Sequence, residues 1–331
     1  MNKIRVAVIG VGRLGGHHAR WYNKLAQCEL TGVYDVASER AEALATELHV
    51  TAFATLDQAL DSADVFSIVT PTSAHHEVAL QALQRGKHVL IEKPITASAK
   101  QARELIALAE QNDCVLTVGH IERFNPATLA LKDVKLAPRF IEAHRLAAFN
   151  PRATDVAVIL DLMVHDIDLA LHFVGSEVVG VHASAVPVIS ELADIANVRI
   201  EFVNGAVANL TASRISLQPM RKMRIFERDS YYALDFASKT ADMYNLVGQG
   251  AVSADENDSA TMYPLGESGR QLMYRQKSVS ADDDMLRMEL DAFLNAVANK
   301  VPVAVSGAEA LAALEVALEV ERVAKAGHLV D

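Results

Sequence analysis

Residues 4–35 read IRVAVIGVGRLGGHHARWYNKLAQCELTGVYD, and the rest of the N-terminal part repeats their order of strand and helix. The apolar run Ile4–Ile9 is typical of a strand that is buried on both faces. A Gly-x-Gly-x-x-Gly motif, made by Gly10, Gly12 and Gly15, follows directly and leads into a helix-like stretch. Glycines at such a turn let the backbone approach a pyrophosphate, which the N–H groups of the helix N-terminus then bind. The motif is weak alone, but its place between a strand and a helix predicts a dinucleotide-binding unit.

The type of dinucleotide is indicated by Asp35, which ends the second apolar run, Leu30–Tyr34. An acidic residue about 20 residues after the glycine motif typically binds the ribose hydroxyls of NAD. A 2′-phosphate would be repelled by this carboxylate, and no basic residue directly follows it, so NAD is favoured over NADP. Arg40 is close enough in the sequence to make NADP the less favoured alternative rather than an excluded one. A purely structural alternative is that Asp35 and Ser38 only begin the next helix.

Strands and helices continue to alternate as far as residue 120, which predicts a doubly wound parallel sheet. Ligands of such sheets bind outside the carboxyl ends of the strands. Lys93 follows one predicted strand, so its ammonium group could reach a substrate oxygen and stabilise a developing alkoxide. The alternative is a surface lysine that pairs with Glu92. Three motifs share this position after a strand: Thr70-Pro71, Glu92-Lys93-Pro94 and Gly119-His120.

A second candidate site lies in the stretch 154–175, which reads TDVAVILDLMVHDIDLALHFVG. The pattern predicts a mostly apolar helix that carries Asp161 and His165 one turn apart on the same face. A carboxylate beside an imidazole makes a good general-base pair, because it orients the ring and stabilises its charged form. The alternative is a buried helix whose polar groups only satisfy one another.

The remaining sequence predicts a second domain built on an antiparallel sheet. Asn204-Gly205 is a strong signal for a short hairpin, and a second hairpin is expected around Asp229-Ser230. Ser306 and Glu309 form a capping box for the last helix. The stretch 248–280 is compatible with a substrate loop, a strand pair or a plain surface loop. We therefore expect a Rossmann domain over 1–121 and an α+β domain with a large open, mainly antiparallel sheet over 122–331.

Composition limits the functions that need to be considered. The 331 residues are 51% hydrophobic and 22% charged, which is enough for sizeable cores, and the net charge of −11 disfavours nucleic-acid binding. Two cysteines predict buried free thiols rather than disulfides, and the adjacent histidine pairs lack a third ligand, so no metal is expected. The N-terminus shows no signal peptide or membrane span, so a cytoplasmic protein without membrane association is expected.

Taken together, these motifs resemble the glucose–fructose oxidoreductase / inositol dehydrogenase / MocA family over nearly the whole chain. The resemblance rests on the order and spacing of the glycine motif, Thr70-Pro71 with His75, Glu92-Lys93-Pro94 and residues 161–166. It implies a Rossmann domain followed by an α/β domain whose open sheet joins subunits into dimers or tetramers. It further implies that His165 takes the proton of a sugar hydroxyl, Asp161 positions the substrate or the imidazole, and Lys93 polarises the reacting oxygen.

Residues 122–126 and 161–168 are similar to the branch of this family that acts on nucleotide sugars. That similarity implies NAD-dependent oxidation of UDP-N-acetylglucosamine or a related sugar at C3. A free sugar or polyol such as inositol is the alternative substrate, and a non-catalytic NAD(P)-binding regulator is the alternative from another class of protein. The residues expected to contact the cofactor are Gly10, Gly12, Arg13, Leu14, Gly15, Asp35, Arg40, Thr70, Pro71, His75, Glu92 and Lys93. The residues expected to contact the substrate are Lys93, Arg123, Asn125, Asp161, His165 and Arg214, where Arg123 and Arg214 have the alternative role of structural ion-pair partners.

Overall fold

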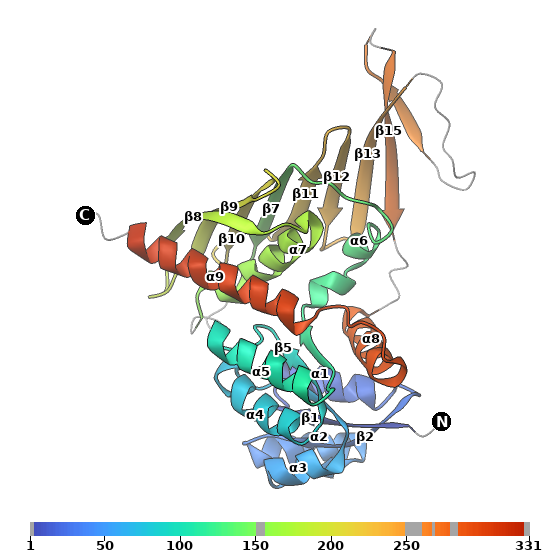
Figure 1. The fold of residues 1–331 in the computed structure, drawn as a ribbon, viewed down its shortest axis with the longest axis vertical. Helices are drawn as coiled ribbons and strands as arrows, with labels where there is room; N and C mark the ends of the chain where they lie inside the picture. Colours follow the sequence, from blue (N-terminus) through green and yellow to red (C-terminus); the bar gives the residue numbers. More distant parts are fainter. Residues whose placement is uncertain (1–2, 150–155, 249–259, 267–268, 279–283, 328–331) are drawn as a thin grey trace. The chain divides into compact units, whose positions relative to one another are not determined.

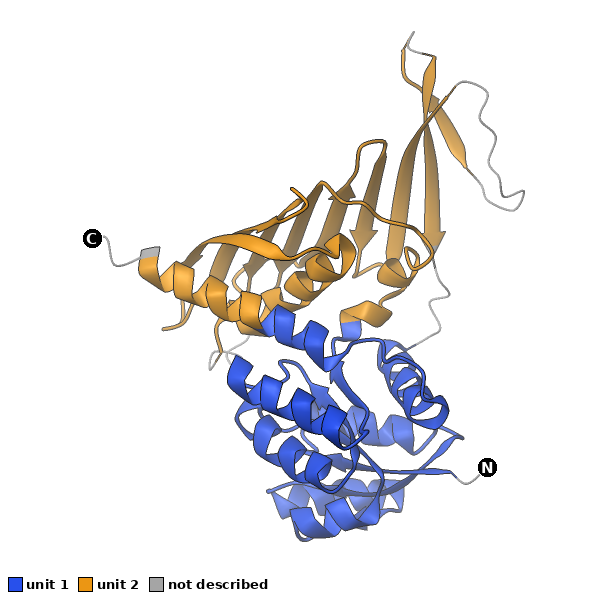
Figure 2. Cartoon of the chain, viewed as in Figure 1, with its two compact units in different colours: residues 1–121, 283–314 blue, residues 122–282, 315–331 orange. Residues whose placement is uncertain are grey.

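The computed structural model describes residues 3–149, 156–248, 260–266, 269–278 and 284–327. They form two compact units (Figure 2): unit 1 comprises residues 1–121 and 283–314, and unit 2 comprises residues 122–282 and 315–331. The first crossing between the units falls at 121/122, where the sequence changes its pattern. Helix α8 (Met285–Asn299) and the first part of α9 (Gly307–Gly327) belong to unit 1, although they follow most of unit 2 in the sequence.

Unit 1 is built on a six-stranded parallel sheet with the order β3-β2-β1-β4-β5-β6 (Figure 1). This is the doubly wound order of dinucleotide-binding domains, so the predicted Rossmann fold is confirmed. The strands are β1 (Ile4–Ile9), β2 (Cys28–Tyr34), β3 (Thr51–Ala52), β4 (Val65–Ile68), β5 (His88–Glu92) and β6 (Leu116–Gly119). The connecting helices are α1 (Arg13–Tyr22), α2 (Ser38–Leu48), α3 (Leu56–Ser62), α4 (Thr72–Gln84) and α5 (Ala99–Gln111).

Local sequence explains where several of these helices begin and end. The hydroxyl of Ser98 accepts a hydrogen bond from the Gln101 N–H and caps α5, as its sequence predicts. Thr55 caps α3 in the same way through the N–H of Gln58. Gly86 has φ +69° and ends α4 in the left-handed conformation that a helix C-terminus favours.

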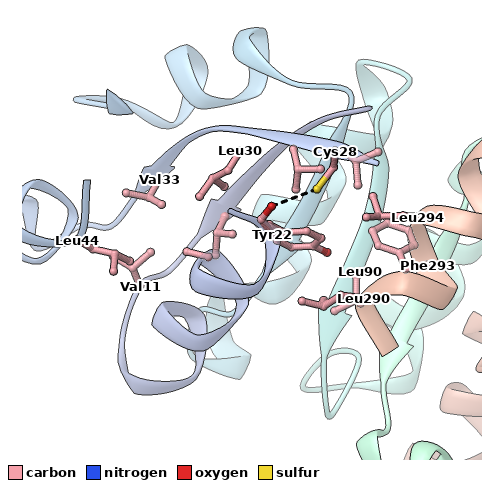
Figure 3. Packing of buried hydrophobic residues seen from close by; sticks show 14 of the residues in the cluster. Val11, Tyr22, Cys28, Leu30, Val33, Leu44, Leu90, Leu290, Phe293 and Leu294 are labelled. Carbon is pink, nitrogen blue, oxygen red and sulfur yellow. Dashed lines mark hydrogen bonds between the residues drawn. The ribbon is translucent and has the colours of Figure 1, made fainter. Parts of the chain in front are cut away.

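The core of unit 1 includes residues from a distant part of the chain (Figure 3). Leu290 and Phe293 of α8 pack in the same buried cluster as Tyr22 of α1 and Leu90 of β5. Cys28 is buried beside them as a free thiol, and its Sγ donates to the carbonyl oxygen of Tyr22. Helix α8 therefore completes the core of the domain that contains the parallel sheet, which explains why it belongs to unit 1.

Unit 2 contains a nine-stranded sheet with the order β14-β15-β13-β12-β11-β7-β10-β9-β8. All neighbouring strands are antiparallel except β7 and β10, so the expected mainly antiparallel sheet is confirmed. The strands are β7 (Phe140–Leu146), β8 (Val178–Val186), β9 (Ile195–Phe202), β10 (Val207–Ser213), β11 (Met220–Phe226), β12 (Ser230–Asp235), β13 (Thr240–Gly248), β14 (Thr261–Pro264) and β15 (Arg270–Ser278). Short helices accompany it: η1 (Ile121–Phe124), α6 (Pro126–Leu129), the π-helical turn η3 (Ile159–Met163) and α7 (Val164–Val174).

One face of this sheet is covered and the other is open. Helices α6 and α7 lie over the same face in Figure 1, where α7 contacts β7 and β10 and α6 contacts β12, β13 and β15. Strand β7 alternates accordingly, because Ile141, Ala143 and Arg145 are buried while Phe140 and Glu142 are only half-buried. The half-buried residues Phe140 and Glu142 therefore point to the open face of the sheet, and the buried residues point to the face that the helices cover.

Two local predictions for the sequence after residue 121 are confirmed, the hairpin in unit 2 and the capping box at the start of α9 in unit 1. Asn204 and Gly205 form the turn between β9 and β10, and Gly205 has φ +82°. The carboxylate of Glu309 accepts hydrogen bonds from the N–H and hydroxyl of Ser306, and the Glu309 N–H donates back to that hydroxyl. Within 248–280 the described residues form the strand pair β14–β15, while residues 249–259, 267–268 and 279–280 lie outside the described part.

No helix among the described residues is long and apolar enough to cross a membrane.

Candidate active site

A cleft of about 740 Å³ opens at the carboxyl ends of β1, β2, β4 and β5 in unit 1. It is lined by every residue that the sequence predicted to contact a cofactor, with one exception, His75. The predicted residues on its wall are Gly10, Gly12, Arg13, Leu14, Gly15, Asp35, Arg40, Thr70, Pro71, Glu92 and Lys93. Tyr34, Val36, Val69 and Glu77 also line it and were not predicted, although Tyr34 and Val36 flank Asp35 in the sequence.

Each glycine of the motif has a separate geometric role. Gly10 has φ +85°, and a Cβ there would lie 2.7 Å from the carbonyl oxygen of Val69. A Cβ on Gly15 would lie 1.9 Å from the carbonyl oxygen of Gly10, so this glycine allows helix α1 to pack against the turn. Gly12, in contrast, has open space around the position of a Cβ and precedes α1 without a side-chain cap. Its exposed backbone and the open helix N-terminus fit a pyrophosphate.

Asp35 is held at the other side of this loop. Its Oδ2 accepts a hydrogen bond of 2.8 Å from the Val11 N–H, and its Oδ1 accepts one of 2.9 Å from the Ala37 N–H. Each carboxylate oxygen can accept more than one hydrogen bond, so both remain able to accept from ribose hydroxyls. The open Gly12 backbone and the anchored Asp35 carboxylate therefore fit the pyrophosphate and the adenosine ribose of a dinucleotide.

Lys93 and Glu92 mark the end of the cleft opposite Asp35. Both follow from β5, and Lys93 is half-buried while Glu92 is buried. His75 lies beneath them rather than on the wall: its Nδ1 is 2.9 Å from the Pro94 carbonyl oxygen, and its Nε2 is 2.9 Å from the Thr70 carbonyl oxygen. Burial lowers the pKa of His75, although the two carbonyl contacts oppose this effect. His75 thus connects the loops after β4 and β5, and it supports the cleft without lining it.

In unit 2, Asp161 lies on the turn η3 that leads into α7, and His165 lies in the first turn of α7. The sequence predicted one regular helix over 154–175, but the described part contains the π-helical turn η3 before α7, and residues 150–155 lie outside the description. A π turn inserts one extra residue per hydrogen-bonded ring, and such turns occur frequently at functional sites. Asp161 and His165 remain half-buried, so both can meet a ligand.

The other two acids of this segment have structural partners. Asp168 accepts two hydrogen bonds from the guanidinium of Arg123, at 2.6 and 2.9 Å. Asp166 accepts two from Arg145, at 2.9 and 2.8 Å, and Arg145 also donates to Glu122 at 2.8 Å. Burial raises the pKa of Asp166, and the charge of Arg145 opposes that effect. These buried ion pairs fasten α7 to η1 and β7.

The three predicted substrate residues Arg123, Asn125 and Arg214 are all buried. Asn125 caps α6 through the Ala127 N–H and donates to Glu122 and to the Phe236 carbonyl oxygen. Arg214 donates to Asp194 at 2.8 Å, to the Val156 carbonyl oxygen and to Ser190. This arrangement favours the alternative of structural ion pairs. Direct contact with a substrate stays a prediction for these residues, and their occupied polar groups argue against it.

Sequence reasoning missed a buried cluster behind the Lys93 end of the cleft. His18 of α1 is fully buried and its Nε2 lies 3.1 Å from Glu92 Oε1. Glu289 of α8 is also buried, and the charge of Glu92 adds to burial in raising the Glu289 pKa well above its usual range. A signal for Glu289 was present, because it interrupts the apolar stripe of Leu286, Leu290 and Phe293. No group of three or more potential metal ligands occurs among the described residues.

Comparisons with known proteins agree with this geometry. Residues 4–120 match the oxidoreductase family with an NAD-binding Rossmann fold, GFO_IDH_MocA, and residues 135–228 match the GFO/IDH/MocA C-terminal domain. UDP-N-acetylglucosamine 3-dehydrogenase of Acidithiobacillus ferrooxidans is 42% identical over 322 residues, which cover 97% of each chain. The solved structure of that dehydrogenase superposes with a TM-score of 0.86 at 40% identity, covering 98% of this chain and 99% of the other.

More distant relatives show how far the similarity extends. The scyllo-inositol 2-dehydrogenase (NAD(+)) of Bacillus subtilis is 29% identical over 234 residues, which cover 65% of this chain and 68% of that protein. An NAD binding oxidoreductase from Klebsiella pneumoniae shares the fold, with a TM-score of 0.82 at 17% identity and coverage of 97% and 96%. From the two family domains and the full-length similarity, we conclude that this chain belongs to the Gfo/Idh/MocA family of NAD-binding oxidoreductases.

Proposed function

We propose that this protein is an NAD-dependent dehydrogenase that oxidises the C3 hydroxyl of UDP-N-acetylglucosamine or a closely related nucleotide sugar. The observation that carries the proposal is the 42% identity over 97% of the chain to UDP-N-acetylglucosamine 3-dehydrogenase. The proposal is supported by the position of Lys93 on the wall of the cleft in unit 1 and by the partial exposure of Asp161 and His165 in unit 2.

Different residues of the chain would bind the cofactor and act on the substrate in such a reaction. Gly12 and the N-terminus of α1 hold the pyrophosphate, and Asp35 holds the adenosine ribose, which leaves the Glu92 and Lys93 end of the cleft for the nicotinamide. Bound NAD supplies the hydride acceptor. Lys93 donates a hydrogen bond to the reacting oxygen and stabilises its developing negative charge. His165 takes the hydroxyl proton, and Asp161 orients the imidazole or the sugar.

Two alternatives follow from specific observations. The identity of 29% to an inositol dehydrogenase keeps a free polyol as the second substrate class. A non-catalytic NAD(P)-binding regulator would need the cleft of unit 1 but not Lys93, Asp161 and His165 together, so their presence favours the enzyme.

The experiment that tests the proposal follows NADH absorbance with NAD and a panel of UDP-sugars and free polyols. A rise with UDP-N-acetylglucosamine supports the proposed substrate, and a rise with a polyol alone replaces it with the second class. If calorimetry shows NAD binding while no member of the panel gives a rise, the regulator becomes the better description.

We further propose that the open face of the unit 2 sheet joins copies of this chain into a homodimer or homotetramer. Five aromatic rings form a ladder across this face, with centroids 4.8 to 5.6 Å apart, and the register pairs each ring with the next. An open sheet face with contiguous rings is costly to leave in water and suits a self-complementary interface. The ladder consists of Phe140, Phe226, Tyr231, Tyr244 and Tyr274.

A further inference from the structure

A second hollow lies entirely within unit 2, where the segment leading into η3, the end of β8 and the last turns of α9 meet. Its volume is about 470 Å³, and nine of its twelve lining residues are apolar. A concave, mostly apolar pocket with a few polar groups is the usual form of a site for a small organic molecule. Neither Asp161 nor His165 lines this hollow, and it shares no lining residue with the cofactor cleft. We call it the η3 pocket.

The loop between β8 and β9, which forms one wall of the η3 pocket, is fixed by a buried carboxylate. Oδ2 of Asp194 accepts hydrogen bonds from three consecutive N–H groups, those of residues 188–190, at 2.6 to 2.9 Å. Its Oδ1 accepts from Nε of Arg214 at 2.8 Å, and Arg214 also donates to the carbonyl oxygen of Val156 on the wall next to η3. Both walls are therefore held in place without a ligand, which lowers the entropic cost of binding one.

This firmly held loop nevertheless exposes apolar side chains around the pocket. Leu192 lines the pocket with 38% of its surface exposed, and the nearby Val188 and Ile189 are each 58% exposed. Val156, on the other wall, is 38% exposed as well. A loop that could rearrange would bury such groups, but the hydrogen bonds of Asp194 hold this one in place. Exposed apolar side chains gathered in one place mark a surface that binds another molecule.

One carboxylate of the pocket lacks a partner. Glu321 of α9 lines the pocket and is half-buried, and it makes no hydrogen bond or ion pair in the described part of the chain. Burial raises the pKa of Glu321, and the charge of Lys325, one turn along the helix, opposes that effect only in part. The lining holds one further acid, Glu191, so the pocket has two carboxylates, one ammonium group and a net negative charge when all three are ionised.

We propose that the η3 pocket binds a small organic amine, whose ammonium group pairs with Glu321 and whose apolar body packs against the walls. A carboxylate without a partner among apolar groups is unfavourable, and a cation that brings its own apolar surface satisfies the carboxylate and the walls together. A neutral molecule would cover the walls but leave the carboxylate unpaired, and an anion would be repelled by it. The inference does not depend on the proposed function, because the pocket and the cofactor cleft have no lining residue in common.

A ligand in the pocket should stabilise the turn that carries Asp161. The Val158 N–H donates to the carbonyl oxygen of Ala193 at 3.0 Å, and the Asp161 N–H donates to that of Ala157 at 3.1 Å. Ala157 and Ala193 both line the pocket. A ligand that contacts both walls opposes the opening of these hydrogen bonds, so the amide hydrogens of the turn should exchange more slowly when the pocket is filled.

The test uses three probes that share a phenyl ring and differ in charge: phenethylamine, phenethyl alcohol and hydrocinnamate. Calorimetry on the wild-type chain at neutral pH, with saturating NAD present, should show that the amine binds severalfold more tightly than the alcohol and that the carboxylate binds most weakly. Glu321→Gln should weaken the amine about tenfold, as expected for the loss of a charge-assisted hydrogen bond, and should change the alcohol less than twofold. Glu319→Gln is the matched control, because Glu319 lies on the same helix outside the lining and pairs with Arg322 at 2.6 Å. It should leave all three affinities unchanged.

A second variant keeps the test valid if Glu321→Gln alters the fold. Leu192→Lys places an ammonium group at the exposed mouth of the pocket, so it should weaken phenethylamine severalfold and strengthen hydrocinnamate instead. Hydrogen exchange of the wild-type chain with phenethylamine bound should show protection in residues 156–161 and 187–194 and none in unit 1.

Three results would overturn the inference: equal affinity for the three probes, equal effects of Glu321→Gln and Glu319→Gln on the amine, or protection outside the pocket. Absence of amine binding would overturn it too, and a lower mass of Ile189→Arg in size-exclusion chromatography would then show that a second copy of the chain covers this surface. Failure of the proposed function would appear separately, as an absence of NADH formation while the amine still binds.

Discussion

Four titratable side chains lie close together on η3 and α7, and they differ in how deeply they are buried. Asp166 and Asp168 are buried and each holds an arginine in a two-point ion pair. Removing one member of such a pair leaves an uncompensated buried charge, which typically costs about 3–5 kcal/mol of folding stability. Asp161 and His165 are half-buried, so part of each side chain is exposed and can meet a ligand. The first two acids therefore position the turn that presents the other pair.

His165 should be the general base. Changing His165→Ala should lower kcat by about 10²–10⁴-fold, which is the usual contribution of a positioned base. NAD binding should stay within twofold of wild type, because His165 is not among the residues that line the cofactor cleft of unit 1. His182→Ala, at an exposed histidine of β8, is the control and should retain full activity. A loss below tenfold at His165 would remove it from this role.

Lys93 should act on the reacting oxygen rather than on the cofactor. The substitution Lys93→Met keeps the length of the side chain but removes the charge, so turnover should fall below detection while the calorimetric Kd for NAD changes little. Lys100→Met, at an exposed position of α5, should behave as wild type. Normal turnover by the Lys93 variant would refute its catalytic role.

Asp35 should determine the choice between NAD and NADP. Asp35→Ala removes acceptors for the ribose hydroxyls and should weaken NAD by about tenfold or more, as expected for charge-assisted hydrogen bonds. The same change removes the repulsion of a 2′-phosphate, so NADP should weaken far less. Because Asp35 also accepts the Val11 and Ala37 N–H groups, loosening of the loop would affect both cofactors equally. Equal weakening would therefore mean that Asp35 only supports the loop. Glu39→Ala, at an exposed acid in the first turn of α2, should leave both affinities unchanged.

Spacing along the chain predicted residues that follow strand ends, but it could not predict pairing across the fold. Lys93 and Asp35 line the cleft because strand order alone brings their positions to one edge. Arg214 and Asp194, in contrast, meet because two neighbouring strands place them together, and no local pattern reveals that their charges neutralise each other. The structure is therefore needed to distinguish an arginine that can contact a substrate from one that is held in a buried ion pair.

Substitutions in the glycine turn before α1 should separate effects on folding from effects on NAD binding. Gly12→Ala adds a methyl group in open space, so the domain should fold with a melting temperature close to wild type. That methyl group would occupy the space of the pyrophosphate, and NAD binding should weaken by about tenfold or more, as expected when backbone contact to an anion is lost.

Gly15→Ala should have the opposite primary effect. Its Cβ would lie 1.9 Å from the Gly10 carbonyl oxygen, so α1 must move away from the turn and the chain should lose about 2–4 kcal/mol of stability, in the range of severe packing changes. Thermal unfolding and NAD titration of both variants check this pair. Equal melting temperatures for the two variants would show that the packing of α1 against the turn is not required.

Elements with local signals could be predicted, and those that depend on tertiary partners could not. The capping box at Ser306 and Glu309 and the hairpin at Asn204-Gly205 were predictable because a few adjacent residues determine them. The π turn η3 has no such signal, since its sequence fits a regular helix equally well. Helix α8 has a clear apolar stripe, but the stripe does not say which core it joins.

The two sheets of the molecule differ in how their faces are covered. The parallel strands of unit 1 are connected by helices, and such crossover helices cover the faces of a parallel sheet. The sheet of unit 2 has helices over one face (Figure 1), and its open face carries the ladder of rings beside charged pairs such as the exposed Arg224 with the half-buried Glu142. An interface with an aromatic centre and a charged rim is typical of protein assemblies. This composition of the open face supports the proposal that copies of the chain assemble through the second sheet.

The wild-type chain, of 35.8 kDa, should have the mass of a dimer or tetramer in size-exclusion chromatography with light scattering. The double change Tyr231→Arg and Tyr244→Arg places two like charges on adjacent strands at the centre of the ladder, where burial against a second copy would leave them without counter-charges. The double variant should elute as a monomer while its circular dichroism spectrum stays unchanged, because both side chains already lie on the open face. Leu217→Arg, at a fully exposed loop position, is the control and should keep the wild-type mass. A monomeric wild-type chain, or a double variant that keeps its assembly, would show that copies do not associate through this face.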